Sequence, residues 1–163
     1  MSLCIVYYSR TGVTEKLASA IASLAREELG IEASLHRVRP VKEYSKPLHL
    51  NPRLWSDTLG SKLVDVRVEP PLNLSTCSAL VLAAPIWIGR VAPPMTSFVK
   101  RELRRYRGSV LCVATSRFGR YCRVFLELLR SVGIEGSRCI DVIDRVAARD
   151  PSGAARRVLG ELR

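Results

Sequence analysis

The sequence contains no glutamine, and its only asparagines are Asn51 and Asn73. Charge is abundant by contrast, since lysine and arginine together number 26 and all but five of these are arginine. Few thermolabile amides and many charged side chains are typical of proteins from thermophiles. The composition therefore predicts a thermophilic source, although biased base composition of a genome would leave the same pattern.

Cysteines at metal-binding or redox-motif spacing are also missing. The chain has five cysteines, an odd number, with no CxxC pair and no Cys/His cluster among them. These spacings predict neither a disulfide framework nor a zinc site. We expect mostly small, buried apolar side chains at the five positions, which are Cys4, Cys77, Cys112, Cys122 and Cys139.

No apolar run approaches the roughly 20 residues that span a bilayer. The strand-like pattern begins at Leu3, so no charged and apolar leader precedes it. We therefore expect a cytoplasmic protein without membrane insertion. With 47% hydrophobic residues, a chain of 163 residues can bury a sizeable core, and we expect one domain over residues 1–163.

The net charge of +11 raises the question of nucleic-acid binding. Basic residues are spread over every predicted helix, and the densest run, KRELRRYRG at 100–108, lies at a predicted helix C-terminus, where cations favour the helix dipole. We expect a solvated basic surface rather than nucleic-acid binding. Docking of an acidic partner or RNA is the alternative.

Short apolar runs alternate with segments of helical period along the chain. Continuous runs of Val, Ile and Leu are typical of strands covered on both faces, and their alternation with helices predicts a doubly wound, five-stranded parallel α/β sheet. The predicted strands are 3–8, 33–38, 79–84, 109–115 and 138–143. The predicted helices cover 17–29 before Gly30, Pro93 to Gly108, 124–132 before Gly133, and Asp150 to Leu162.

The connection over residues 40–76 is too long for a structureless loop in a compact domain. Asn51 and Pro52 suit the N-cap and the first position of a short helix. The stretch VDVRVEPP at 64–71 alternates apolar and charged residues, which is typical of an exposed extended segment. We expect an elaborated second crossover, with a helix that holds Trp55, Leu59 and Leu63.

Three hydroxyls and a glycine follow the first predicted strand, where the next helix begins. Gly12 allows close approach of the backbone, and unpaired N–H groups at a helix start bind anions. Neither GxxxxGK(S/T) nor GxGxxG is present, so a terminal monophosphate fits better than a nucleoside triphosphate or a nicotinamide dinucleotide. The alternative is that Thr11 only caps the helix. The loop residues are Ser9, Arg10, Thr11, Gly12, Val13 and Thr14.

Two further loops lie at the same edge of the predicted sheet, after the third and fourth strands. Trp87 stands in the first of them, and its flat face suits a flavin ring, although packing within the domain or at a dimer contact is the alternative. The second contains Phe118 and Tyr121, for which ordinary loop packing is one interpretation. The candidate residues are Pro85, Ile86, Trp87, Ile88, Gly89, Thr115, Ser116, Arg117, Phe118, Gly119 and Tyr121.

Residues 9–14 match the (S/T)xTGx(S/T) phosphate loop of the flavodoxin family, and PIWIG at 85–89 resembles that family's Pro-Ile-Tyr/Trp-x-Gly loop. The resemblance covers the whole chain and implies strand order 2-1-3-4-5 with FMN as cofactor. By its position after the fourth predicted strand, the third loop corresponds to the family's third flavin-contacting loop, which implies that Phe118 or Tyr121 covers the other face of the flavin ring.

The resemblance also implies an FMN-binding redox protein, and more specifically an NAD(P)H-dependent oxidoreductase of the flavin or quinone type. Its electron donor or acceptor would be NAD(P)H, a quinone or a redox protein. A non-enzymatic electron carrier, or an interaction module without cofactor, is the alternative. A homo-oligomer is a further possibility that the sequence does not decide.

The sequence departs from the family in charge, because many flavodoxins are acidic near the flavin. Here Arg10, Arg90, Arg117 and Arg120 fall in the predicted site, and they would raise the flavin potential by stabilising negative charge on the reduced ring. We assign no catalytic acid or base and no metal ligand. His36 and His49 are expected to be structural.

A cysteine-dependent phosphatase is a rival interpretation, since Cys4 and Arg10 have CxxxxxR spacing. Cys4 falls inside a predicted strand, where no loop amides lower a thiol pKa. The same spacing from Cys139 to Arg145 shows how easily the pattern arises by chance.

Overall fold

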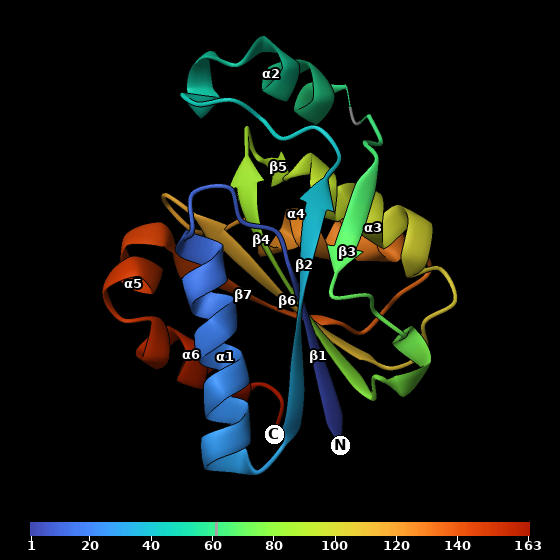
Figure 1. Ribbon diagram of the computed structural model, residues 1–163, viewed down its shortest axis with the longest axis vertical. Helices are drawn as coiled ribbons and strands as arrows, with labels where there is room; N and C mark the ends of the chain where they lie inside the picture. The colour runs from blue at the N-terminus through green and yellow to red at the C-terminus, as the bar shows by residue number, and fades with distance from the viewer. Residues whose placement is uncertain (61) are drawn as a thin grey trace.

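In a computed structural model, which describes residues 1–60 and 62–163, a twisted sheet lies between two layers of helices (Figure 1). Seven strands belong to the sheet within that part of the chain. They are β1 (Ser2–Tyr7), β2 (Glu32–Pro40), β3 (Val66–Glu69), β4 (Ala79–Trp87), β5 (Arg90–Val91), β6 (Ser109–Ser116) and β7 (Arg138–Ile143).

Five of the strands, in the order β2-β1-β4-β6-β7, are parallel. These are the five strands predicted from the sequence, and they have the predicted order 2-1-3-4-5. The structure adds β3, which pairs antiparallel with the edge strand β2, and β5, which forms a hairpin with the end of β4. The extended character of 64–71 is thus confirmed, and its alternating residues lie on an edge strand with one side toward solvent.

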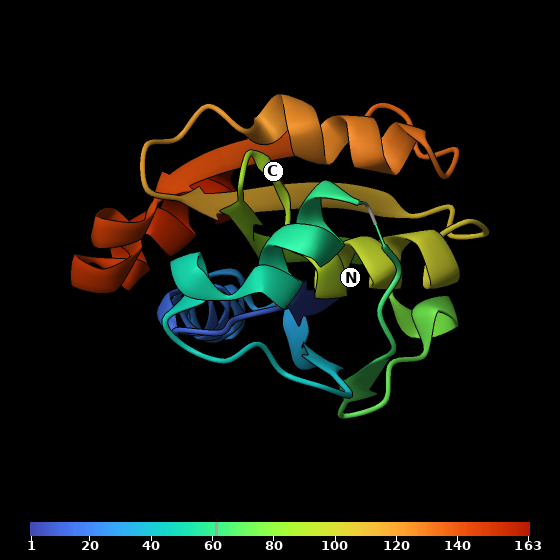
Figure 2. The same cartoon turned by 90° about the horizontal axis from the view of Figure 1, so that it is seen from above.

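The helices are α1 (Val13–Leu29), α2 (Pro52–Leu59), α3 (Pro93–Glu102), α4 (Cys122–Arg130), α5 (Asp144–Arg149) and α6 (Pro151–Gly160), with short 3-10 turns η1 (Leu48–Leu50) and η2 (Leu74–Thr76). Helices α1, α5 and α6 cover one face of the sheet, and α3 and α4 cover the other (Figures 1 and 2). No helix in the described part of the chain is long and apolar enough to cross a membrane.

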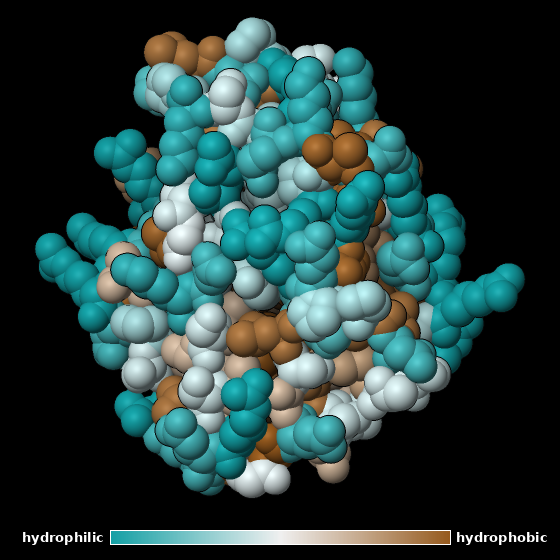
Figure 3. All heavy atoms as spheres, in the orientation of Figure 1, coloured by the Kyte–Doolittle hydropathy of each residue, from teal (hydrophilic) through white to brown (hydrophobic). Residues whose placement is uncertain are grey.

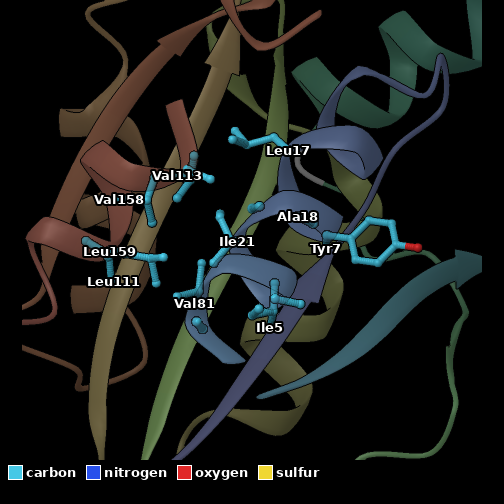
Figure 4. Close-up of a cluster of buried hydrophobic side chains, with 14 of the residues drawn as sticks. Ile5, Tyr7, Leu17, Ala18, Ile21, Val81, Leu111, Val113, Val158 and Leu159 are labelled. Atoms are coloured by element: carbon cyan, nitrogen blue, oxygen red, sulfur yellow. The ribbon is translucent and has the colours of Figure 1, made fainter. Parts of the chain in front are cut away.

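Each sheet face carries its own apolar core, because successive side chains of a strand point to opposite faces. On the α1 face, Ile5 and Val81 pack against Ile21 of α1 (Figure 4). On the α3 face, Leu80 and Phe98 belong to the second cluster. The continuous apolar runs that predicted buried strands therefore supply both cores.

Local signals set most helix boundaries. Gly30 ends α1 in a left-handed conformation, and the Asn51 side chain accepts hydrogen bonds from the N–H groups of Arg53 and Leu54, which begins α2 as predicted. Several helix boundaries differ from the prediction, among them the ends of α3 and α2. Helix α3 ends at Glu102 rather than continuing toward Gly108, and α2 ends at Leu59, so Leu63 lies beyond it. Helix α5 was not predicted.

The prediction that cysteines form no disulfide was wrong. Cys4 on β1 is bonded to Cys77 after η2, and Cys122 at the start of α4 is bonded to Cys139 on β7. The spacing gave no sign of this, because the tertiary fold and not the local sequence brings each pair together. Cys112 is a buried free thiol, as expected of a small apolar side chain.

Candidate functional site

The loop after β1 leaves the start of α1 open. Gly12 occupies the N-cap position with φ +95°, and no side chain caps the helix. The hydroxyl of Ser9 instead accepts a hydrogen bond from the Gly12 N–H at 3.1 Å, which fixes the turn. The Thr11 side chain therefore does not act as the cap that was the alternative interpretation. The first N–H groups of α1 stay available to an anion.

A hydroxyl pair joins this loop to the strand β6. The Oγ1 atoms of Thr14 and Thr115 lie 2.7 Å apart and are buried. One of the two hydroxyls donates to the other, so only one of the two protons is left for a ligand. The pair holds the first and third predicted loops together at the carboxyl edge of the sheet.

The orientation of Trp87 is set by two tyrosines. The Trp87 ring meets the rings of Tyr8 and Tyr44 edge to face, with centroids 5.6 Å and 5.3 Å away. Such pairs contribute about 0.5–1.5 kcal/mol each beyond burial. Tyr44 belongs to the long connection over 40–76, so that segment reaches the site and supports the predicted aromatic residue.

Both tyrosines are held by carboxylates. The Tyr8 hydroxyl donates to Glu43 at 2.8 Å, and the Tyr44 hydroxyl donates to Asp57 at 2.9 Å. Burial first, and then these hydrogen bonds, raise the pKa of each phenol. The two phenols therefore stay protonated and keep their donor role throughout the physiological pH range.

A pocket of about 170 Å³ opens between these elements. It is small beside the roughly 300–1,000 Å³ of common small-molecule sites. The structure gathers nine of the predicted site residues around it: Ser9, Arg10, Thr11, Val13, Thr14, Pro85, Ile86, Trp87 and Thr115. The first and second loops are thus placed side by side, as the topology predicts.

The remaining predicted residues do not line this pocket. Phe118 is 75% exposed, with the Arg117 guanidinium 5.5 Å above its ring, and the Tyr121 ring packs against the α3-face core. Ser116 accepts a hydrogen bond from the Gly119 N–H at 2.9 Å, which closes the third loop on itself. The residues outside the lining are Gly12, Ile88, Gly89, Ser116, Arg117, Phe118, Gly119 and Tyr121.

The four arginines expected at the site do not gather there. Arg10 lines the pocket, and its Nε donates to the backbone oxygen of Tyr44 at 2.7 Å. Arg90 lies on β5 and lines a separate groove, and neither Arg117 nor Arg120 lines the pocket. The sequence placed these arginines at the site because they belong to the site loops. The turns at 88–89 and 119–120 have positive φ, and this backbone geometry sets the direction in which the neighbouring arginine side chains point.

Sequence reasoning missed Asp144 and Leu48, which also line the pocket. Asp144 opens α5 directly after β7, and burial raises the pKa of its carboxyl. An acidic residue at the end of the fifth strand was a visible signal, since carboxyl ends of parallel strands meet at one edge. The sequence gave no signal for Leu48, because its place at the pocket depends on how the long connection over 40–76 folds.

The cysteine phosphatase interpretation fails on geometry. Cys4 and Cys139 are both in disulfides, so neither sulfur is available as a nucleophile. His36 is buried and hydrogen-bonded through its two ring nitrogens to Ser34 Oγ and the Pro70 carbonyl, which fits a structural role. Over residues 1–60 and 62–163, no group of three or more acidic, His or Cys side chains could hold a metal ion.

Solved structures share this fold. The chain is similar to a flavoprotein from Lactobacillus acidophilus NCFM crystallised in complex with FMN, with 20% identity, TM-score 0.69, and coverage of 91% of this chain and 97% of that one. It is also similar to a point mutant of flavodoxin from Pseudomonas aeruginosa, with 16% identity, TM-score 0.60, and coverage of 99% of this chain and 96% of that one.

A flavodoxin from the domain Archaea matches with 14% identity, TM-score 0.55, and coverage of 98% of this chain and 99% of that one. No protein-family model and no curated protein matches the sequence. At these identities the comparisons establish a flavodoxin-like α/β fold for the chain, with the strand order that the sequence predicted.

Proposed function

We propose that the chain is an FMN-binding redox protein that holds the FMN phosphate at the start of α1. The observation that carries this proposal is the uncapped N-terminus of α1, which opens into a pocket lined by Thr11 and Trp87. An open helix N-terminus favours a phosphate through its free N–H groups and its dipole. The flavoprotein of the same fold that was crystallised with FMN supports this choice of ligand.

The donors of the pocket fit the phosphate end of FMN. Gly12 brings the backbone close to the pocket without a side chain, and a Cβ built there would meet no atom within 4 Å. Arg10 adds a guanidinium, whose Nη nitrogens make no hydrogen bond within the described residues. Because the pocket measures only about 170 Å³, it suits the phosphate and the adjoining chain, and the ring would lie at its rim beside Trp87.

The residues of the chain would bind and orient the cofactor rather than take part in proton transfer. Tyr8 and Tyr44 fix the Trp87 ring, which would pack against the flavin and exclude water from it. The Thr14–Thr115 hydrogen bond keeps the phosphate loop joined to the sheet. When bound, FMN supplies one-electron or hydride transfer.

The finer proposal is an NAD(P)H-dependent oxidoreductase of the flavin or quinone type. Arg10 is assigned to the phosphate and Asp144 lines the same pocket, so the charges around the pocket do not choose between a hydride acceptor and a low-potential carrier. The resemblance to the flavodoxin family supports either, and the activity measurement below makes that choice.

Two measurements test the proposal in order. The purified protein is mixed with excess FMN, desalted, and its visible spectrum is recorded; we expect a bound flavin, and a colourless protein would overturn the proposal. The loaded protein is then given NADH or NADPH with a quinone or ferricyanide. Oxidation of the nicotinamide supports the enzyme, whereas bound flavin without any oxidation points to an electron carrier.

A further inference from the structure

A second and larger hollow lies on the other side of the β4–β5 hairpin from Trp87. It is a groove of about 410 Å³, within the range of small-molecule sites. Trp87 lines the pocket on one side of the hairpin, and Gly89, Arg90 and Val91 line the groove on the other. We call it the α3–α4 groove.

The walls of the α3–α4 groove are regular helix faces. Pro93, Thr96 and Lys100 of α3 line one wall at i, i+3 and i+7 spacing. Val124 and Leu128 of α4 give the opposite wall an apolar surface. The C-terminal half of α2 and the hairpin close one end of the groove, since both α2 and α4 contact β5.

One buried hydroxyl on this groove has no partner. Thr58 of α2 lines the groove and is 3% exposed, yet within the described residues its Oγ1 has no hydrogen-bond partner. An unpaired buried polar group costs about 1–3 kcal/mol. The other hydroxyls that line the groove already donate inside the protein, Thr96 to the Val91 oxygen and Ser131 to the Leu128 oxygen. The Thr58 hydroxyl is closed off from solvent, so a ligand in the groove does not reach it in this conformation.

The balance of charge in the groove is positive. Lys62, Arg90 and Lys100 line it, and the Lys100 ammonium makes no hydrogen bond or ion pair within residues 1–60 and 62–163. The two lining carboxylates are engaged elsewhere. Asp57 accepts from Tyr44 and lies 3.5 Å from Arg53, and Glu127 lies 3.0 Å from Arg123.

We propose that the α3–α4 groove binds a phosphate-bearing small molecule, with Lys100 contacting the phosphate and the rest of the molecule lying on Val124 and Leu128. Lysine ammonium groups bind phosphate as point charges, and a charge-assisted hydrogen bond is about twice as strong as a neutral one. This site is separate from the proposed FMN pocket, so one can fail without the other.

The test is calorimetric titration with ADP, inorganic phosphate and adenosine of protein that has been loaded with one FMN per chain and desalted, because free FMN also carries a phosphate and would compete for the groove. The bound FMN blocks the start of α1, which would also attract phosphate. We expect ADP to bind with Kd below about 1 mM, and adenosine, which lacks phosphate, to bind at least about tenfold more weakly. Comparing the affinities of ADP and inorganic phosphate distinguishes a site for an organic phosphate from a site for the free anion. Tighter binding of ADP than of inorganic phosphate supports a role for the apolar wall.

Three variants assign the binding to the groove. Lys100→Ala is expected to weaken ADP binding about tenfold or more, whereas Thr58→Val removes a hydroxyl that the ligand does not reach and is expected to leave ADP binding unchanged. Arg130→Ala is the matched control, because it removes the same charge from an exposed position on α4 that does not line the groove. All three should keep the FMN affinity of the parent protein.

Three results would overturn the proposal: adenosine binding as tightly as ADP, no detectable binding of either phosphate compound, or an equal effect of Lys100→Ala and Arg130→Ala. If the parent protein does not retain FMN, the same titrations are run on the protein alone, where a weakening by Lys100→Ala still supports the groove.

Discussion

At the scale of single residues, the conformation of Gly12 decides whether the start of α1 can meet a phosphate. Its φ of +95° lies in the left-handed region, where a residue with a side chain is strained by about 1–2 kcal/mol. No neighbouring atom lies within 4 Å of an added Cβ, so a substitution there acts through the backbone and not through a clash.

Gly12→Ala should therefore lower the free energy of unfolding by about 1 kcal/mol and weaken FMN about tenfold, because the N–H groups turn away from the phosphate. Gly30→Ala is the matched control, since Gly30 ends the same helix with φ +62° and free space for a Cβ. The control should lose similar stability in urea unfolding and keep its FMN affinity. Equal losses of FMN affinity in the two variants would contradict the assigned site.

Asp144 is the other residue whose chemistry matters at the pocket. Burial raises the pKa of its carboxyl above the unfolded value, so the protonated form is favoured in the folded protein. Asp144 thus contributes stability that is fully present below its unfolded pKa and lost as the pH rises through its folded pKa. When the carboxyl is ionised, its negative charge also opposes a phosphate in the pocket.

Asp144→Asn should bind FMN more tightly at pH 7, by about tenfold, and unfold at a higher urea concentration. The advantage should shrink as the pH falls through the Asp144 pKa. Titrating parent and variant with FMN at several pH values checks this, because ionisation of the FMN phosphate affects both proteins equally. An advantage that stays constant from pH 4 to about 7 would contradict the role of Asp144 charge.

At the scale of elements, the sequence predicted what local patterns determine. Asn51 with Pro52 marked the start of α2, and Gly30 marked the end of α1, because a cap depends on one or two side chains. The contact of Tyr44 with Trp87 was not predictable, since it depends on how the long connection folds back over the sheet. The pairing of cysteines was missed for the same reason.

The two disulfides fasten different elements. Cys4–Cys77 joins residues 73 apart and Cys122–Cys139 joins residues 17 apart. On loop-closure entropy, the first contributes about 4 kcal/mol and the second about 3 kcal/mol. The paired variant Cys4→Ala/Cys77→Ala should therefore unfold at lower urea concentration than Cys122→Ala/Cys139→Ala, and both should unfold below the parent.

A thiol count provides an independent check on the disulfides. Under denaturing conditions without reductant, one thiol should react, that of Cys112, and five should react after reduction. Five reactive thiols in the unreduced protein would contradict the two bonds.

At the scale of the whole molecule, the excess of positive over negative side chains is the most unusual property of the protein. The net charge is +11, and the surface seen in Figure 3 is dominated by hydrophilic side chains with small apolar groups between them. Several surface ion pairs, such as Arg39–Glu69 and Arg156–Glu28, offset little of the repulsion, because exposed pairs contribute about 0–1 kcal/mol each.

Screening should therefore stabilise the protein. Raising NaCl from about 0.01 M to 0.15 M shortens the range of charge interactions from roughly 30 Å to 8 Å, and the thermal midpoint should rise by a few degrees. Scanning calorimetry at both salt concentrations measures this. A midpoint that falls with salt would mean that attractive ion pairs outweigh the net repulsion.

The central claim is that the phosphate of FMN is recognised at the uncapped start of α1. Calorimetric titration with FMN and with riboflavin, which differs by that phosphate alone, tests it most directly. The account predicts that FMN binds about a hundredfold or more tightly than riboflavin, which equals about 2.7 kcal/mol. Equal affinity for the two flavins would contradict it.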